Sequence, residues 1–191
     1  MKWMETNARI RQADLSSLVV IRYPDPRLRE VCAAVDEPSA PEVRALVERM
    51  TELLFTSRGV GLAAPQVAVA ARMFIASPTF QRDDLGVYVN PEIVHVDGQQ
   101  DGEEGCLSFP GITCKVRRYN VVTVRATGLD GRPFEETAEG LTARIFQHEI
   151  DHLSGTLLAD RMGSVAKLAN RRALKDLEDQ FVAACGSGDF P

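Results

Sequence analysis

The chain has 191 residues, a length that fits one domain with a sizeable core. It is 45% hydrophobic and 26% charged, and its 27 acidic and 22 basic residues give a formal net charge of −5. That balance excludes a nucleic-acid binder working by bulk positive charge, so we expect no sequence-specific nucleic-acid contact. No run of eighteen apolar residues occurs, so the sequence predicts no membrane span.

The N-terminal residues 1–7 carry one Lys and no apolar segment before a polar stretch, which is not the pattern of a secretory signal. Arg9 and Arg11 are a weak transit-peptide signal, but we favour a loosely ordered bacterial extension over residues 1–18. The four cysteines show no regular disulfide spacing, which indicates a reducing compartment and, by default, the cytoplasm. We therefore expect a single catalytic domain over residues 19–185 and a tail over 186–191.

Residues 18–21 are apolar and predict a short strand, which the two prolines of the segment 23–26 end in a turn. Ser39-Ala40-Pro41-Glu42 has the pattern of a capping box, and the spacing after it predicts a helix over residues 41–57. The apolar stripe of this helix is typical of core packing and consists of Val43, Leu46, Val47, Met50 and Leu54.

Gly59 and Gly61 flank Val60 and carry no Cβ, so the backbone there can approach a ligand or another strand closely. A plain turn explains the two glycines equally well. Gln66 is the polar exception in the apolar segment 62–67.

The middle of the chain has the alternation of strands. Strands are predicted over residues 72–76 and 86–97, the second broken at Asn90-Pro91, and an extended segment over 103–108 presents Cys106. A long strand over residues 116–127 is followed by Asp130-Gly131, a strong hairpin signal, and by a return strand over 133–137. The β part is therefore antiparallel or mixed.

The segment His148-Glu149-Ile150-Asp151-His152 lies on a helix predicted over residues 141–154 and ended by Gly155. Histidines four apart share one helix face, so both imidazoles can reach one metal ion. Glu149 would lie beside that ion, where a carboxylate can take a proton from water, so the pattern favours metal-dependent hydrolysis. The alternative is an ordinary amphipathic helix with two satisfied histidines.

A catalytic metal usually takes three ligands from the protein, and the residues leave the third open. Leu158 stands where the longer metzincin pattern has its third histidine. Cys106, His95 and the downstream Glu178 remain as candidates. A last helix is predicted over residues 165–184, capped by Ser164, with a basic face of the kind that is usually solvated: Lys167, Arg171, Arg172 and Lys175.

Three segments in order resemble the motifs of the peptide deformylases: Gly59-Val60-Gly61-Leu62-Ala63-Ala64-Pro65-Gln66, Glu104-Gly105-Cys106-Leu107-Ser108 and His148-Glu149-Ile150-Asp151-His152. The resemblance runs from about Val19 through the C-terminal helix. With the element pattern, it implies an α+β fold in which antiparallel or mixed β-sheets pack around a central metal-binding helix, with an N-terminal helix and a C-terminal helix.

The resemblance implies hydrolytic removal of the formyl group from the N-formylmethionine of newly synthesised polypeptides, with release of formate. It assigns one divalent metal ion to Cys106, His148 and His152, and proton transfer to Glu149. It assigns stabilisation of the substrate's carbonyl oxygen to the Leu107 backbone N–H and the Gln66 side chain. The family's use of ferrous iron implies Fe²⁺ in the cell, and Zn²⁺, Ni²⁺ or Co²⁺ would suit the same ligands in isolated protein.

The implied methionine pocket draws on Val60, Leu141, Ile145 and the His148 ring, while Gly59 and Gly61 would pair with the main chain of the peptide. Arg144 stands where an apolar residue is common in the family. We expect its stem to line the outer pocket wall and its charge to reach water. Asp151 is expected to be structural and paired with Arg118.

Two other hypotheses stay open at this point. A general metallopeptidase would use a different third ligand, such as Glu178. A non-catalytic, deformylase-like metal-binding module would make Glu149 dispensable. Docking of the basic C-terminal helix on the ribosome is a further, weaker hypothesis about partners.

Overall fold

The structure, a computed structural model, describes residues 4–187. The described helices are α1 (Met4–Gln12), α2 (Pro41–Thr56), α3 (Gly140–Leu153), α4 (Leu158–Arg161), α5 (Ser164–Ala169) and α6 (Arg171–Ser187). The strands are β1 (Gly61–Ala63), β2 (Met73–Ala76), β3 (Gly86–Asp97), β4 (Gln100–Gly105), β5 (Thr113–Arg118), β6 (Val121–Thr127) and β7 (Pro133–Glu139). Short 3-10 helices are η1 (Leu15–Ser17), η2 (Pro26–Arg29), η3 (Ala64–Val67) and η4 (Arg82–Asp84).

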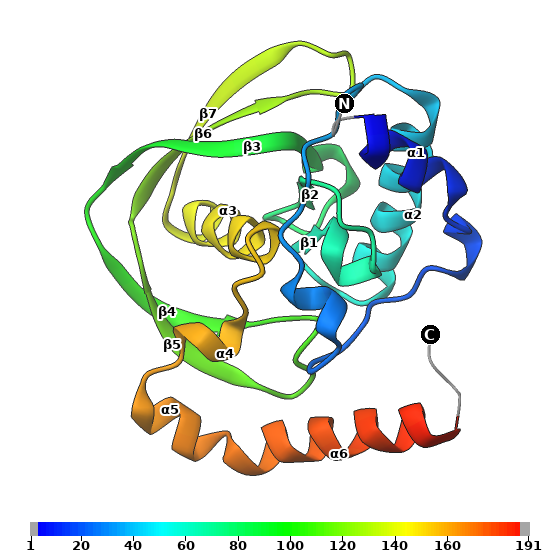
Figure 1. Ribbon diagram of the computed structural model, residues 1–191. Coiled ribbons are helices and arrows are strands. Elements are labelled where there is room, and N and C mark those ends of the chain that lie inside the picture. Colours follow the sequence, from blue (N-terminus) through cyan, green and yellow to red (C-terminus); the bar gives the residue numbers. More distant parts are fainter. Residues whose placement is uncertain (1–3, 188–191) are drawn as a thin grey trace.

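The strands form two antiparallel sheets around α3. Five of them follow the order β1-β2-β3-β6-β7, and β4 pairs with β5 in a second, two-stranded sheet. Figure 1 shows α3 lying between these two sheets, with α1 and α2 to one side and α6 running along the outside of β4 and β5. The expected α+β fold around a central helix is thus confirmed.

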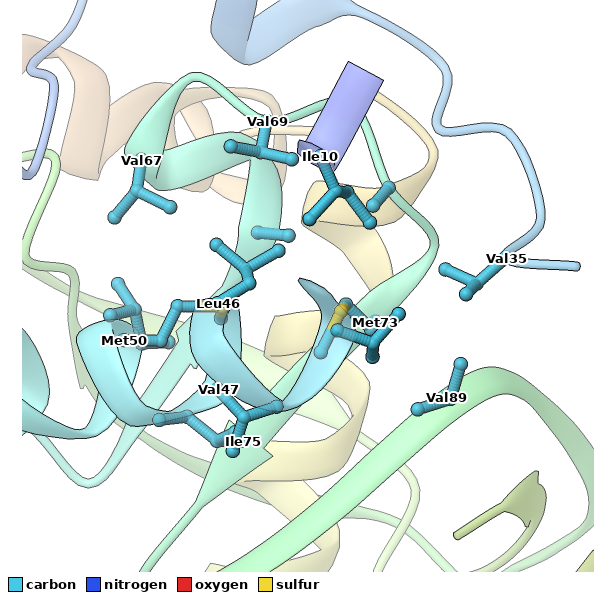
Figure 2. Close-up of a cluster of buried hydrophobic side chains, with 14 of the residues drawn as sticks. Ile10, Val35, Leu46, Val47, Met50, Val67, Val69, Met73, Ile75 and Val89 are labelled. Atoms are coloured by element: carbon cyan, nitrogen blue, oxygen red, sulfur yellow. The ribbon is translucent and has the colours of Figure 1, made fainter. Parts of the chain in front are cut away.

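The core beside α2 is built from the stripe that the sequence predicts. All five apolar positions of that stripe are buried, and Figure 2 shows Leu46, Val47 and Met50 in one cluster with Ile75 of β2. The capping box predicted over residues 39–42 does not form, however. Ala40 takes the cap position without a side-chain hydrogen bond, and Pro41 starts the helix, where its missing N–H costs nothing.

The strand predicted over residues 18–21 does not form, and two other predicted strand boundaries are wrong. β3 runs through Asn90-Pro91 instead of breaking there, because a bulge between Val89 and Glu92 absorbs a residue and Asn90 takes φ +53°. The Asn90 side chain then bonds the backbone N–H and C=O of Val35 at 2.8 and 2.7 Å. The long pattern over residues 116–127 is two strands, β5 and β6, separated by the turn at residues 119–120.

The N-terminal segment carries a packed helix rather than a loosely ordered extension. Ile10 of α1 is 1% exposed and joins the core beside α2 (Figure 2). Asn7 bonds the backbone of Asp36 and Glu37, which lead into α2. The expectation for residues 1–18 missed these contacts because α1 has little apolar periodicity; residues 1–3 lie outside the described part of the chain.

The C-terminal helix is divided where one helix is predicted. α5 ends at Ala169 and α6 starts at Arg171, with the Asn170 side chain donating to Thr113 of β5 and to Ala166. Gly163, not Ser164, holds the cap position of α5. Most of the tail expected over residues 186–191 lies outside the described residues.

Candidate metal centre

Two faces of α3 make different contacts. Phe146 packs its ring against Phe74 of β2 and Tyr88 of β3, with centroid separations of 5.8 and 4.8 Å, and this anchors the helix on the larger sheet. His148 and His152, one turn apart, point toward the end of β4 instead. The helix ends at Leu153, and Gly155 takes φ +70° just beyond it, so the predicted stop is confirmed.

The structure brings Cys106 to the two histidines. Its Sγ lies 3.3 Å from His152 Nε2, and one donor atom from each of Cys106, His148 and His152 lies within 4.8 Å of the others. The imidazole rings have centroids 5.0 Å apart and cross at 74°. One sulfur and two nitrogens converging on a point form a donor set that suits Fe²⁺, Zn²⁺, Ni²⁺ or Co²⁺.

The other candidates for a third ligand lie elsewhere. His95 is exposed on β3, opposite Thr123 of β6. The Glu178 carboxylate on α6 accepts a hydrogen bond from the Tyr23 hydroxyl at 2.8 Å. Neither belongs to the described group of metal-ligating side chains, so a metallopeptidase built on Glu178 is not favoured.

The tautomer of His148 is fixed by Glu104. His148 Nδ1 lies 2.9 Å from Glu104 Oε2, and an ionised carboxylate only accepts, so Nδ1 carries a proton. In the neutral ring that metal binding requires, the lone pair is then on Nε2. Burial would raise the pKa of Glu104, but hydrogen bonds from Arg118 and His148 outweigh it and hold that pKa well below its usual range. Burial lowers the pKa of His152 well below its ordinary value, which favours a neutral ligand.

Glu104 is the site residue that sequence reasoning missed. The resemblance places it in a motif but gives it no role. A signal was available, because residues two apart on a strand face the same side, so an extended segment that presents Cys106 also presents Glu104. The expected pairing of Asp151 with Arg118 is present, with Arg118 Nη1 donating to Asp151 Oδ2 at 2.6 Å.

Arg144 does not do what the sequence predicts. Its side chain is 6% exposed, so its charge does not reach water. The guanidinium instead donates to Glu104 Oε1 at 2.8 Å and to the carbonyl oxygen of Val116 at 2.9 Å. The long stem does reach the pocket wall, but the charge is drawn inward by a buried carboxylate that the sequence pattern does not reveal.

Glu149 lies beside the ligand group and is 4% exposed. Its Oε2 is buried without a hydrogen-bond partner among the described residues. Burial raises the pKa of this carboxyl group to about 7. A buried acceptor without a protein partner is costly, so this oxygen is suited to a polar ligand held at the metal-ligand cluster.

A cavity of about 560 Å³ opens over this cluster. It is lined by all the predicted substrate-binding residues and by most of the predicted catalytic and ligand residues, namely Gly59, Val60, Gly61, Gln66, Cys106, Leu107, Leu141, Ile145, His148 and Glu149. Leu141 is 58% exposed and Ile145 5%, so the apolar wall runs from the mouth inward.

The Gln66 amide is held in a defined orientation. Its Oε1 accepts from the Ala63 N–H at 2.8 Å, which turns Nε2 toward Ser108 Oγ at 3.2 Å and Cys106 Sγ at 3.4 Å. The NH₂ group therefore faces the ligand cluster, where a donor is useful to an oxygen that gains negative charge.

We expect Asp151→Asn to lower the free energy of unfolding by about 2 kcal/mol, because Asp151 accepts charge-assisted hydrogen bonds from Arg118 and Arg161. Thermal unfolding measures the effect. The matched control is Asp179→Asn, which removes an exposed helix pair with Lys175 and should leave the melting temperature almost unchanged. Equal melting temperatures for both variants would contradict a structural role for Asp151.

We expect Gly61→Ala to slow catalysis about 100-fold, the effect of displacing a reacting group by about 1 Å. A Cβ at Gly61 would overlap Glu149 Oε1 and come within 2.8 Å of its Cδ. Initial rates of substrate hydrolysis measure it. Gly163→Ala is the control, since its Cβ would meet no described atom within 4 Å. Unchanged rates in Gly61→Ala would show that the carboxylate does not lie against this backbone during turnover.

A cysteine sulfur and two imidazoles on converging elements, with a buried carboxyl group beside them at the base of an open cavity, define a metal-dependent hydrolase of the His-Glu-x-x-His type. Comparison with known proteins narrows this class to one family.

The chain belongs to the polypeptide deformylase family, whose profile matches residues 18–168. It is 45% identical over 159 residues to the peptide deformylase of Acidobacterium capsulatum, covering 82% of this chain and 93% of the relative. It is 46% identical over 147 residues to peptide deformylase 2 of Nitrosomonas europaea, covering 76% and 78%. The crystal structure of the Legionella pneumophila peptide deformylase superposes with a TM-score of 0.79 at 38% identity, covering 85% and 96%.

The activity is therefore removal of the formyl group from the N-terminal N-formylmethionine of new polypeptides, with release of formate. The described residues contain no helix long and apolar enough to cross a membrane. The family assignment does not favour a general metallopeptidase or a non-catalytic module.

Proposed function

We propose that this deformylase holds its metal ion with Cys106 Sγ and one nitrogen each of His148 and His152, and uses Glu149 as its general base. The observation that carries this assignment is the orphaned, buried Oε2 of Glu149 beside the three converging donor atoms. When bound, the ion supplies Lewis acidity and activates water for attack on the formyl carbon. A carboxylate with a pKa near 7 is suited to accept a proton at neutral pH and return it to the leaving amine.

Two donors serve the carbonyl oxygen of the substrate. The Gln66 amide has its orientation set by the Ala63 N–H, so its NH₂ group needs no reorganisation as charge develops. The backbone N–H of Leu107 lies in the tight turn that follows Cys106, in which the Phe109 N–H bonds the Cys106 carbonyl at 2.9 Å. Each such donor is worth about 3 kcal/mol of transition-state stabilisation.

The peptide binds by strand addition at β1, which is an edge strand of the described five-stranded sheet. The Val60 carbonyl accepts from the Ser77 N–H, so the pleat turns the N–H and C=O of Gly61 to the opposite edge, away from β2. Backbone pairing tolerates varied sequence beyond the first residue. The methionine side chain enters the apolar wall formed by Val60, Leu141 and Ile145.

Fe²⁺ is the proposed ion in the cell, with Zn²⁺, Ni²⁺ or Co²⁺ in isolated protein. A thiolate ligand at the floor of an open cavity makes an iron site sensitive to oxidation. The test is purification under anaerobic conditions, metal analysis, and an assay of formate released from formyl-Met-Ala before and after exposure to air. Iron-bound protein that releases no formate would refute the assignment of this site, while activity with zinc alone would refute the choice of iron.

A cytoplasmic location is proposed because the substrate is a nascent chain and because Cys32, Cys106, Cys114 and Cys185 are all free thiols. The basic face of α5 and α6 is exposed and supports a second proposal, that it docks on ribosomal RNA. Co-sedimentation with ribosomes at low and raised salt tests this contact. Charge reversal at Arg171 and Arg172 should abolish co-sedimentation, while reversal at the exposed Arg132 of the β6–β7 turn should not.

A further inference from the structure

We propose that Arg144 is a positioning residue of the metal centre. It completes the set of hydrogen bonds that orients the His148 ring through Glu104, and it fixes α3 to the strand that leads to Cys106. The inference rests on the proposed metal site and extends it to a residue outside the proposed set of metal ligands.

The first step is the hydrogen bonding of the Glu104 carboxylate. Oε1 accepts from Arg118 Nε and Arg144 Nη1, both at 2.8 Å. Oε2 accepts from Arg118 Nη2 at 3.0 Å and from His148 Nδ1 at 2.9 Å. An ionised carboxylate has about four acceptor positions, so Arg144 takes the last one and leaves no lone pair for water. These four hydrogen bonds fix the orientation of the carboxylate, with Oε2 toward His148 Nδ1.

The second step is the tie between α3 and the smaller sheet. Besides Glu104, Arg144 Nη1 donates to the carbonyls of Gly102 on β4 and Val116 on β5, at 3.3 and 2.9 Å. Its Nη2 donates to the backbone and side-chain oxygens of Gln100, at 3.4 and 3.2 Å. Cys106 directly follows the last residue of β4, so one guanidinium on the histidine helix also fixes the strand that presents the sulfur.

Gly102 provides the space for this arrangement. A Cβ built there would lie 2.9 Å from Arg144 Nη2, 3.0 Å from its Cζ and 3.1 Å from its Nε. The guanidinium therefore lies close against the β4 backbone at this glycine, and a Cβ there would displace it.

A role in packing alone does not explain this arginine. Replacing a buried ion pair by apolar residues of similar size often leaves a protein equally or more stable, because the cost of desolvating the charges offsets their attraction. Met is a close match to the Arg144 stem, and Arg118 would remain on Glu104 in such a variant. Arg144→Met should therefore affect metal binding more than the melting temperature.

The experiment uses the full chain loaded with Co²⁺ and then mixed with a chelator in excess. Arg144→Met should lose the ion about 10–100-fold faster than the wild type and show an altered Co²⁺ absorption spectrum, the size expected for an outer partner of a ligand. Arg144→Lys should lose Co²⁺ at a rate between those of the wild type and Arg144→Met, because one ammonium group cannot reach Glu104 and the strand carbonyls together. The kcat for formyl-Met-Ala should fall with KM unchanged.

Two controls separate this role from a general loss of stability. Arg125→Met removes an exposed arginine that pairs with Glu135 on the larger sheet, and it should release Co²⁺ at the wild-type rate. Val47→Ala truncates a buried side chain of α2 and should lower the melting temperature without changing the Co²⁺ spectrum. Wild-type release and spectrum in Arg144→Met would overturn the proposal.

Gly102→Ala provides a second test, in which Arg144 stays in place. It can refute the proposal even if Arg144→Met does not fold. Displacing the guanidinium should speed Co²⁺ loss in the same direction, and adding Gly102→Ala to Arg144→Met should change nothing further. Additive effects, or wild-type release in Gly102→Ala, would overturn it. Wild-type protein that binds no Co²⁺ would overturn the metal site itself, whereas tight binding unaffected by Arg144 would refute this inference alone.

Discussion

Glu149→Gln is expected to lower the rate of formate release by about a thousandfold, within the range that a general base contributes. The amide keeps the shape of the side chain but cannot accept the proton of the attacking water. Formate release from formyl-Met-Ala measures the loss, and metal analysis on the same sample should give wild-type content, because Glu149 is not among the donor atoms that converge on the site. Wild-type turnover in this variant would show that Glu149 is not the base.

The stability of the same variant supplies an internal control. Burial raises the pKa of Glu149 to about 7, so in metal-free protein the native state holds this proton more tightly than an unfolded chain, whose carboxyl pKa is about 4.3. Stability is therefore lost in the wild type as pH rises from about 4.3 to about 7, and the Glu149→Gln variant would not share that loss. The chelated variant should melt no lower than the chelated wild type at pH 8, and the two should converge in acid. A variant that melts well below the wild type at pH 8 would make lost activity a folding effect.

The helix that carries the histidines could be predicted from sequence because its signals are local. His148 and His152 share a face through the helical repeat, and Gly155 marks the end of the helix. The stripe on α2 is equally local, and it packs as its spacing predicts. In each case the information lies within a few turns of one element.

The third ligand could not be derived in that way. The residue pattern leaves Cys106, His95 and Glu178 open as the third ligand, and only the resemblance to a known family selects the cysteine. The choice depends on how β4 meets α3, which no local pattern encodes. The buried pairing of Arg144 with Glu104 joins the same two elements, so it was missed for the same reason.

The strand errors have a related physical cause. Asn90-Pro91 is a turn signal on its own, but the bulge in β3 and the bonds from Asn90 to Val35 let the strand continue. The packing of Ile10 is also set by contact, in this case with α2, and not by the weak pattern of α1. Tertiary contacts override local propensity at these positions.

Cys106→Ala is expected to remove the metal ion and, with it, the activity. Loss of an outer partner of a ligand costs about 10–100-fold in metal affinity, and loss of one of three direct ligands should cost more. Metal content after gel filtration and formate release should fall together to background. The fold should persist, because Cys106 is half-buried and only packs against the edge of the hydrophobic cluster that contains Phe109, Ile112 and Leu177.

The controls for this variant are changes at Glu178 and His95, the two other candidates for the third metal ligand. Glu178→Ala loses a hydrogen bond from Tyr23 and His95→Ala alters an exposed strand position, so both should keep full metal content. Cys185→Ala removes an exposed thiol on α6 and should also be silent, which excludes a general effect of cysteine loss. Metal retained by Cys106→Ala but lost by Glu178→Ala would reassign the third ligand. Because the sulfur is what distinguishes this donor set from a histidine–carboxylate site, the chemistry proposed for the cavity depends on that result.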